Sequence, residues 1–292
     1  MMQEKVAFLF PGQGRIPERL PPASRVAEEL LRHAEERGLP LTRWLREGRA
    51  NLLGETSAAQ PVILIDCLAK EERLREKGIR PAIVAGHSLG EYAATVSAGI
   101  LSPQEALLAV LERGRLMAGV SGGMVAIVKL SPDVVQRICD EIGAGVTVAN
   151  VNGPAQVVIS GPRDALGKAA SLAEQAGGRA IPLGVSGPFH SPLMADAQAG
   201  LAPVLERLRF RDPAIPLVSS VSGRLERDPE EWKKLLLTQI TACVRWVDVV
   251  QALVAAGITQ AIEVGPGDVL VGLSRRITSK IEFLTAEEVL VG

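Results

Sequence analysis

The five residues Gly86-His-Ser-Leu-Gly90 constrain the fold of this chain more than any other stretch. An apolar run at 83–85 precedes them and is typical of a buried strand, and the apolar-rich segment 91–98 that follows is typical of a helix. A sharp turn from strand to helix leaves no room for Cβ atoms beside the central serine, so glycines flank it. The hydroxyl of Ser88 would then lie at a helix N-terminus, which favours developing negative charge. The pattern predicts that Ser88 is a nucleophile; the alternative is a chance Gly/Ser turn.

Composition limits the class of protein. The 292 residues suggest one large or two smaller domains, and an apolar share of 47% is ample for a sizeable core. A formal net charge of −1 gives no general attraction to nucleic acid or to anionic membranes. The first residues lack the features of a signal peptide, and no apolar stretch is long enough to span a bilayer. We therefore expect a cytoplasmic protein that binds neither nucleic acid nor membrane.

The three cysteines, Cys67, Cys139 and Cys243, lack the spacing of metal ligands and lie within apolar segments. Buried free thiols in a reducing cytoplasm are the expected state. The sequence therefore predicts no metal site.

Strands and helices alternate over most of the chain, which implies a mostly parallel sheet covered on both faces. Strands are expected at 6–10, 83–85, 215–221 and 261–264, and helices at 24–37, 57–77, 91–98, 102–117, 191–207 and 246–256, with a further helix capped by Asp228-Pro-Glu-Glu231. Capping boxes at Ser57–Gln60 and Ser102–Glu105 mark two of the helix starts.

The segment 122–187 has a different order of strands and helices. We expect a strand at 124–130, a helix at 131–142, strands at 146–151 and 156–160, a helix at 163–176 and a strand at 179–185. This β-α-β-β-α-β order is that of a ferredoxin-like unit. The chain is therefore predicted to be an α/β protein with a core formed by 1–121 and 188–292 and an inserted ferredoxin-like subdomain at 122–187.

His190 is the histidine that the sequence offers as a base for a Ser-His mechanism. The helix expected at 191–207 begins with Ser-Pro, and the dipole at its N-terminus would disfavour imidazolium, leaving a neutral ring that can act as a base. His33 lies among charged residues on a solvated helix, and His87 is expected to point away from the serine side chain. The alternative for His190 is a capping or core histidine.

Arg113 lies on the apolar face of the helix expected at 102–117. The polar stripe of that helix consists of Glu105, Glu112 and Arg115. A buried arginine is costly unless a carboxylate meets it. From these residues alone, a snorkelling side chain or an internal ion pair is the favoured interpretation.

Further motifs extend over nearly the whole chain: Phe10-Pro-Gly-Gln-Gly14, Thr56 with Gln60-Pro61, Gly86-His-Ser-Leu-Gly-Glu-Tyr92, Arg113, Asn152 with Gln156-Val-Val-Ile-Ser-Gly161, Gly187-Pro-Phe-His-Ser191, Gln239 with Val244-Arg-Trp246, and Glu263-Val-Gly-Pro-Gly267. In this combination and order the sequence resembles the malonyl-CoA:acyl carrier protein transacylase family. The combination is far more specific than G-x-S-x-G alone, which any α/β hydrolase can carry.

The resemblance implies a hydrolase-like α/β core with an inserted ferredoxin-like subdomain, in agreement with the order of elements. It also implies transfer of the malonyl group from malonyl-CoA to the phosphopantetheine thiol of holo acyl carrier protein, through a malonyl-serine intermediate, to supply fatty acid synthesis. Such an enzyme has no permanently bound cofactor, because the partner protein carries the phosphopantetheine.

The resemblance also implies roles for five residues in the chemical steps. Ser88 resembles the acylated nucleophile and His190 its general base. Gln239 matches the position whose backbone carbonyl orients the histidine. Gln13 and Leu89 resemble the residues whose backbone N–H groups form the oxyanion hole.

Two further positions concern the acyl group. Arg113 matches the arginine that pairs with the malonyl carboxylate, which replaces the ion-pair interpretation. Phe189 resembles the aromatic residue that favours malonyl over methylmalonyl by narrowing the space near the α-carbon. The sequence departs from the family at the shortened segment 15–19, which is expected to alter the rim of the entrance.

Three alternatives stay open at this point. A serine hydrolase or thioesterase could use the same core with an additional acid. A non-catalytic assembly or carrier-docking module could have kept the fold. The same chemistry could also serve polyketide synthesis or a malonate-decarboxylase system.

Carrier proteins are typically acidic, so a basic rim is expected around the site. Candidates are Arg275-Arg276 with Lys280, and Arg179. Ordinary solvated surface is the alternative for each of them alone. The sequence gives no indication of the oligomeric state.

Overall fold

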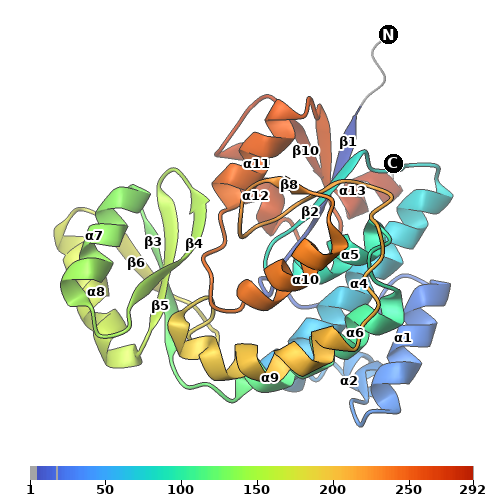
Figure 1. Ribbon diagram of the computed structural model, residues 1–292, viewed down its shortest axis with the longest axis horizontal. Helices are drawn as coiled ribbons and strands as arrows, with labels where there is room; N and C mark the ends of the chain where they lie inside the picture. The colour runs from blue at the N-terminus through green and yellow to red at the C-terminus, as the bar shows by residue number, and fades with distance from the viewer. Residues whose placement is uncertain (1–4, 18, 292) are drawn as a thin grey trace.

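The computed structural model describes residues 5–17 and 19–291, and two separate sheets organise them (Figure 1). The strands of the first sheet are β1 (Val6–Phe10), β2 (Ile83–Gly86), β7 (Leu217–Val218), β8 (Leu225–Glu226), β9 (Gln260–Glu263) and β10 (Glu282–Thr285). Those of the second sheet are β3 (Gly123–Val128), β4 (Thr147–Gly153), β5 (Gln156–Gly161) and β6 (Arg179–Pro182).

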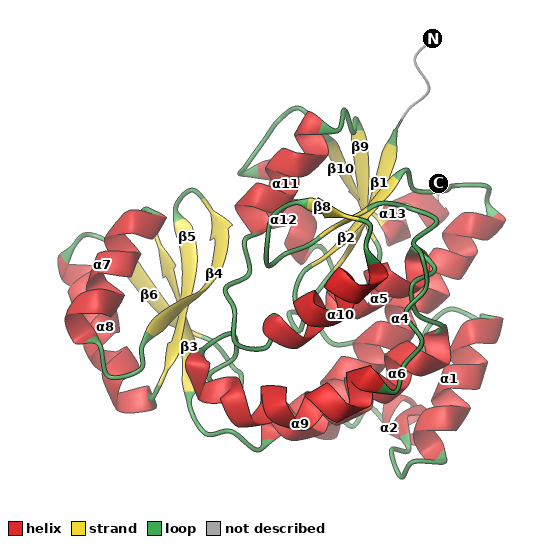
Figure 2. Cartoon of the chain, viewed as in Figure 1, coloured by secondary structure: helices red, strands yellow, loops and turns green. Residues whose placement is uncertain are grey.

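Helices cover both sheets (Figure 2). Those before the second sheet are α1 (Arg25–Glu35), α2 (Leu41–Arg46), α3 (Ala50–Leu53), α4 (Thr56–Glu76), α5 (Gly90–Ser97) and α6 (Pro103–Ala118). The second sheet carries α7 (Pro132–Ile142) and α8 (Arg163–Gln175). The remaining helices are the 3-10 helix η1 (Pro192–Met194), α9 (Ala195–Glu206), α10 (Pro229–Thr238), α11 (Trp246–Ala255), α12 (Val269–Arg275) and α13 (Ala286–Val291).

The first sheet has the strand order β10-β9-β1-β2-β7-β8, and only its edge strand β8 pairs antiparallel. Successive side chains of a strand point to opposite faces, so Phe8 and Phe10 enter a core with α1, α4, α5 and α6, whereas Ala7 and Leu9 enter one with α11 and α12. This burial on both faces explains why β1 reads as a continuous apolar run. The predicted mostly parallel α/β core is confirmed.

The second sheet is antiparallel throughout, in the order β4-β5-β3-β6. Its strands alternate in the same way: Val125 and Ile127 pack against α7 and α8, whereas Met124 and Ala126 face the core of the first sheet. The predicted β-α-β-β-α-β order is therefore confirmed. The face that carries Met124 is the one turned toward the loop after β2.

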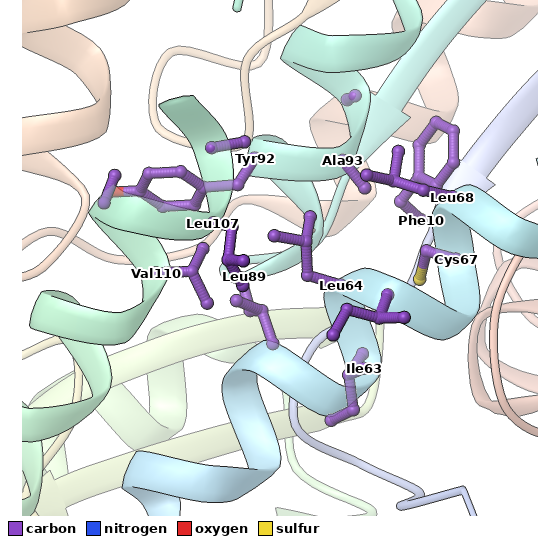
Figure 3. Packing of buried hydrophobic residues seen from close by; sticks show 14 of the residues in the cluster. Phe10, Ile63, Leu64, Cys67, Leu68, Leu89, Tyr92, Ala93, Leu107 and Val110 are labelled. Carbon is purple, nitrogen blue, oxygen red and sulfur yellow. The ribbon is translucent and has the colours of Figure 1, made fainter. Parts of the chain in front are cut away.

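The helices α4, α5 and α6 pack against one another behind that loop (Figure 3). Leu64, Leu89, Tyr92 and Leu107 belong to this buried cluster. Gly114 allows α6 to approach α4 closely, since a Cβ there would lie 3.1 Å from Ser57 Cα. The close approach lets Arg113 of α6 donate to Gln60 of α4, with 2.7 Å between Nη1 and Oε1.

Of three predicted helix starts, the one at Ser57 is wrong and those at Ser102 and Ser191 are confirmed. Helix α4 begins at Thr56 without a side-chain cap, so Ser57 forms no capping box. Ser191 occupies the predicted N-cap position with Pro192 as the first helical residue, but its Oγ donates to the Pro188 carbonyl at 2.6 Å instead of accepting from the helix, and the first turn is the 3-10 helix η1, which leads into α9. The capping box of Ser102 with Glu105 is present, with both hydrogen bonds formed.

Several short elements have no counterpart in the sequence prediction, namely α2, α3, α12, α13, β8 and β10. The four helices have between four and seven residues and β8 has two, too few for apolar periodicity to identify them. The strand expected at 215–221 is also reduced to the two residues of β7.

Candidate active site

Ser88 occupies a strained turn between β2 and α5. Its φ is 54°, in the left-handed region that residues other than glycine rarely adopt. A Cβ on Gly86 would lie 2.1 Å from the Glu91 nitrogen, and one on Gly90 would lie 1.9 Å from the Phe10 oxygen. The glycines predicted to flank the serine are therefore sterically required.

Ser88 and His190 form a hydrogen-bonded pair. The Ser88 hydroxyl donates to His190 Nε2, with 2.7 Å between the oxygen and the nitrogen. His190 Nδ1 donates to the backbone carbonyls of Gln239 at 2.7 Å and Ala242 at 3.2 Å. These carbonyls fix the ring in the tautomer whose Nε2 can accept a proton from the serine.

His190 is neutral in this environment. Burial, followed by the charge of Arg113, lowers the pKa of His190 to about 3, although the carbonyls of Gln239 and Ala242 act in the opposite direction. We expected a helix dipole to keep the ring neutral, but burial is the main cause. A neutral imidazole next to a serine hydroxyl can act as a general base.

The loop after β1 lies against the turn after β2 because the two strands are neighbours in the sheet. The His87 N–H donates to the Phe10 carbonyl at 2.9 Å, and a Cβ on Gly12 would lie 2.8 Å from the His87 oxygen. Among the described residues, no backbone group accepts from the N–H of Gln13 or of Leu89. These two N–H groups are thus available to an external oxyanion.

Hydrogen bonds of side chains hold the Gln13 loop in place. Gln13 Nε2 donates to Thr56 Oγ1 at 3.3 Å, and Thr56 Oγ1 in turn lies 3.2 Å from Ser186 Oγ. Thr56 is the first residue of α4. It links the first loop of the site to the segment that leads to His190.

Arg113 reaches the serine from α6, with only 1% of its surface exposed. Its Nη2 donates to Ser88 Oγ at 3.1 Å and to Gln239 Oε1 at 2.8 Å, and its Nη1 donates to Gln60 Oε1 at 2.7 Å. The guanidinium also lies 5.8 Å from the centre of the Tyr92 ring. Within the described part of the chain, no carboxylate forms a salt bridge with it and its side chain does not reach solvent, so neither an internal ion pair nor snorkelling, the two interpretations from the helix alone, describes Arg113.

A cavity of about 410 Å³ opens onto the pair of Ser88 and His190. Met124, Ala126 and Val158 of the second sheet form one apolar wall, and Leu270 and Leu273 of α12 belong to the lining as well. Polar groups reach the cavity from the loops after the parallel strands, which is the usual place for a ligand in such a sheet.

Phe189 lines the cavity next to His190, and 6% of its surface is exposed. A Cβ on Gly187 would lie 2.7 Å from Phe189 Cε1, so the glycine leaves space for the ring. The ring therefore limits the width of the cavity beside the base.

Three polar residues of the site were not assigned a role from the sequence: Gln60, Glu91 and Asn152. Each lies within a motif that resembles the family, but its contact is made across the fold. Gln60 accepts from Arg113, and Asn152 Oδ1 lies 2.9 Å from His87 Nε2. His87 is thus turned away from the serine, as predicted. The feature of the sequence that could identify these three residues is a polar side chain inside an otherwise apolar helix or strand.

The candidate basic rim is only partly near the cavity. Arg276 donates to Gln156 Oε1, a residue of the lining, at 2.7 Å, whereas Arg275 donates to the Phe283 carbonyl. Lys280 and Arg179 are exposed. Of the shortened segment 15–19, position 18 lies outside the described residues, and the Arg15 side chain lies against Gly267.

Cys67 and Cys139 are buried as expected, but Cys243 is partly exposed, since it lies in the loop after α10. Within residues 5–17 and 19–291, no group of three or more His, Cys, Asp or Glu side chains could hold a metal ion. No helix in this part of the chain combines the length and apolar character needed to cross a membrane.

Comparison with known proteins identifies the family. The model of the acyl transferase domain matches residues 20–289. The malonyl CoA-acyl carrier protein transacylase of Bacillus subtilis (strain 168) is 38% identical over 301 residues, which cover 97% of this chain and 94% of that protein.

Solved structures agree with the sequence match. The acyl-carrier-protein S-malonyltransferase of Burkholderia pseudomallei 1710b superposes with a TM-score of 0.91 at 36% identity, covering 99% of this chain and 100% of that one. A type II PKS acyl-carrier protein in complex with its malonyl-transacylase gives a TM-score of 0.90 at 34% identity, covering 97% and 96%. The chain therefore belongs to the malonyl-CoA:acyl carrier protein transacylase family of acyl transferases.

Proposed function

We propose that the protein transfers the malonyl group from malonyl-CoA to the phosphopantetheine thiol of holo acyl carrier protein, by way of a malonyl ester on Ser88. The observation that carries the proposal is the contact of Ser88 Oγ with both His190 Nε2, at 2.7 Å, and Arg113 Nη2, at 3.1 Å. The first contact suits a nucleophile, and the second suits an acyl group that ends in a carboxylate.

In the first half-reaction, His190 Nε2 accepts the hydroxyl proton while Ser88 Oγ attacks the thioester carbonyl. The N–H groups of Gln13 and Leu89 donate to the oxyanion that forms. The bond from carbon to sulfur then breaks, and the proton on Nε2 passes to the CoA sulfur, so that CoA leaves as a thiol. Ser88 carries the malonyl group as an ester.

In the second half-reaction, the carrier's pantetheine thiol gives its proton to His190 Nε2 and attacks the ester carbonyl. The bond from carbon to Ser88 Oγ breaks, and Oγ takes the proton back from Nε2. The Gln239 carbonyl holds the ring through Nδ1 in both directions. The oxyanion is stabilised by two N–H groups of this chain and the proton is carried by His190, so we propose no resident cofactor.

The substrate itself would make His190 a better base. The charge of Arg113 is the second cause of the low His190 pKa, after burial. A malonyl carboxylate paired with Arg113 would offset that charge and so raise the pKa of His190. An acyl group without a carboxylate would leave the base weak, which favours malonyl over acetyl.

We further propose that Phe189 disfavours a methyl branch on the α-carbon, and that the chain divides into a core of 1–121 and 188–292 with an insert at 122–187. The boundaries are supported by the strands of the second sheet, which all lie between Gly123 and Pro182. A cytoplasmic location and a supply role in fatty acid synthesis complete the proposal. One similar structure comes from a type II PKS, so polyketide synthesis is the second candidate pathway.

The mass of the intact protein after brief incubation with malonyl-CoA tests the proposal. We expect one malonyl group on the wild type and none on Ser88→Ala. An excess of acetyl-CoA should not prevent the malonyl group from appearing on the wild type. Absence of any adduct on the wild type would overturn the proposal and favour a non-catalytic role.

A further inference from the structure

Glu91 is a fully buried carboxylate that the proposed steps do not use. It is the second residue of α5, three positions after the serine, and 0% of its surface is exposed. Its Oε1 accepts from the Ser220 N–H at 2.6 Å, and its Oε2 accepts from the side-chain amide of Gln239. One carboxylate thus connects α5 to the segments that follow β7 and α10.

These contacts leave the Gln239 amide a single orientation. A guanidinium only donates hydrogen bonds, so Arg113 requires the Oε1 of Gln239, whereas the Glu91 carboxylate only accepts and requires Nε2. The backbone carbonyl of the same residue accepts from His190 Nδ1 at 2.7 Å. Gln239 therefore holds Arg113 with its side chain and His190 with its backbone.

We propose that Glu91 is a positioning residue for both the base and the carboxylate-binding arginine, because it fixes the side chain of Gln239 between them. The inference rests on the proposed function and adds a residue that touches neither substrate nor reacting atoms. In a Ser-His-acid triad a carboxylate accepts from the histidine. Here the Gln239 carbonyl does so, and the carboxylate of Glu91 binds the side chain of Gln239 instead of the histidine.

The role requires two acceptor oxygens at position 91. The Ser220 N–H and the Gln239 amide both donate, and a neutral amide or carboxylic acid replaces one acceptor with a donor. Either the Ser220 N–H loses its partner, or Gln239 turns over and directs its NH₂ at Arg113. Both outcomes move the groups that hold His190 and the substrate.

Protonation of Glu91 should therefore act like a substitution. Burial raises the pKa of Glu91 to about 7, against the hydrogen bonds from Ser220 and Gln239 and the charge of Arg113. Arg113 from α6 and Tyr92 from α5 are the charged and titratable groups around it, and burial raises the pKa of Tyr92 to about 12. The activity should fall as the pH falls through about 7.

The test compares Glu91→Gln, Glu91→Asp and the control Glu71→Gln with the wild type. Glu71, in α4, is also a buried carboxylate that contacts α5, because it accepts from Ser97 Oγ at 2.6 Å. Ser97 is the last residue of α5, so this contact lies at the opposite end of the helix from Glu91. Rates of malonyl transfer to holo carrier are measured across about pH 5–9 and divided by the amount of enzyme that malonyl-CoA can acylate.

We expect Glu91→Gln to lower kcat/KM about tenfold or more above pH 7 and to abolish the inflection near pH 7. Glu91→Asp should keep the inflection, because it keeps both acceptors, and Glu71→Gln should match the wild type. A Glu91→Gln enzyme with the wild-type rate per acylated site, or with the wild-type inflection, would overturn the inference.

If Glu91→Gln does not fold, the wild-type and Glu91→Asp profiles decide: absence of the inflection from the wild type overturns the role of Glu91. Failure of the proposed function is a different result. In that case the wild type itself forms no malonyl-enzyme, before any variant is compared.

Discussion

Arg113 Nη2 lies 3.1 Å from Ser88 Oγ, so the nucleophile and the buried cation of the site are in direct contact. The other partners of the guanidinium are the amide oxygens of Gln60 and Gln239, which are neutral. In a malonyl thioester one methylene separates the carboxylate from the reacting carbonyl. A cation placed beside the nucleophile is therefore within reach of that carboxylate.

Removal of Arg113 should affect malonyl transfer selectively. We expect Arg113→Ala to lower kcat/KM for malonyl-CoA about 100-fold or more, because the substrate carboxylate loses a buried, charged partner. Acylation by acetyl-CoA should not fall, since it makes no such contact. Arg115→Ala, on the solvated face of the same helix, is the control. Equal losses for both acyl groups would contradict the pairing of Arg113 with the carboxylate.

Phe189 should control tolerance of a branched acyl group. In Phe189→Ala the cavity widens beside His190, and we expect the preference for malonyl-CoA over methylmalonyl-CoA to fall about tenfold, the usual contribution of one methyl group in a tight pocket. Competition between the two thioesters measures this ratio. Leu193→Ala removes a nearby exposed side chain and should leave the ratio unchanged. If Phe189→Ala keeps the wild-type preference for malonyl-CoA over methylmalonyl-CoA, another residue excludes the methyl branch.

Gly90 should tolerate no side chain. A Cβ there would lie 1.9 Å from the Phe10 oxygen in the neighbouring strand, so Gly90→Ala forces β1 and α5 apart. We expect a loss of about 4 kcal/mol or more in unfolding free energy, or no folded protein. Gly167→Ala in α8 is the opposite case, because no described residue outside its own helical turn has an atom within 4 Å of the added Cβ. It should raise stability by about 1 kcal/mol, and thermal melts compare the two.

Glu263 should make the stability depend on pH. Burial raises the pKa of Glu263 to about 7, so the folded state binds its proton more tightly than the unfolded state. Its contribution to stability is present below the ordinary pKa of a glutamate and is lost as the pH rises through about 7. We expect the unfolding free energy of Glu263→Gln to be lower than that of the wild type at acidic pH. This gap in unfolding free energy should narrow or reverse at alkaline pH. A gap that is independent of pH would contradict this.

The sequence is sufficient for the parts of the site that depend on short-range geometry. Ser88 and its flanking glycines follow from the space available in one turn, and the capping box at Ser102 follows from four consecutive residues. Ser57 has the same local pattern but does not cap its helix, because α4 begins one residue earlier, with Glu55 at the N-cap position. Its first residue, Thr56, contacts Gln13 and Ser186 from distant segments. Local patterns cannot contain that information.

The surroundings of Arg113 depend still more on the whole fold. From the helix alone a buried arginine predicts an ion pair, and only the family resemblance suggested an external carboxylate. The structure adds two neutral amides from α4 and from the end of α10, and a carboxylate, Glu91, behind one of them. Side chains that are 53 and 126 positions away from Arg113 meet there, which no periodicity in the sequence reveals.

The central claim is that the acyl group on Ser88 passes to a carrier rather than to water. The most direct measurement starts from malonyl-enzyme freed of CoA and follows its mass with holo carrier protein, with carrier lacking the phosphopantetheine arm, and with buffer alone. We expect rapid loss of the malonyl group only with holo carrier, matched by its appearance on the carrier. Loss at the same rate in all three would contradict the claim and identify a hydrolase.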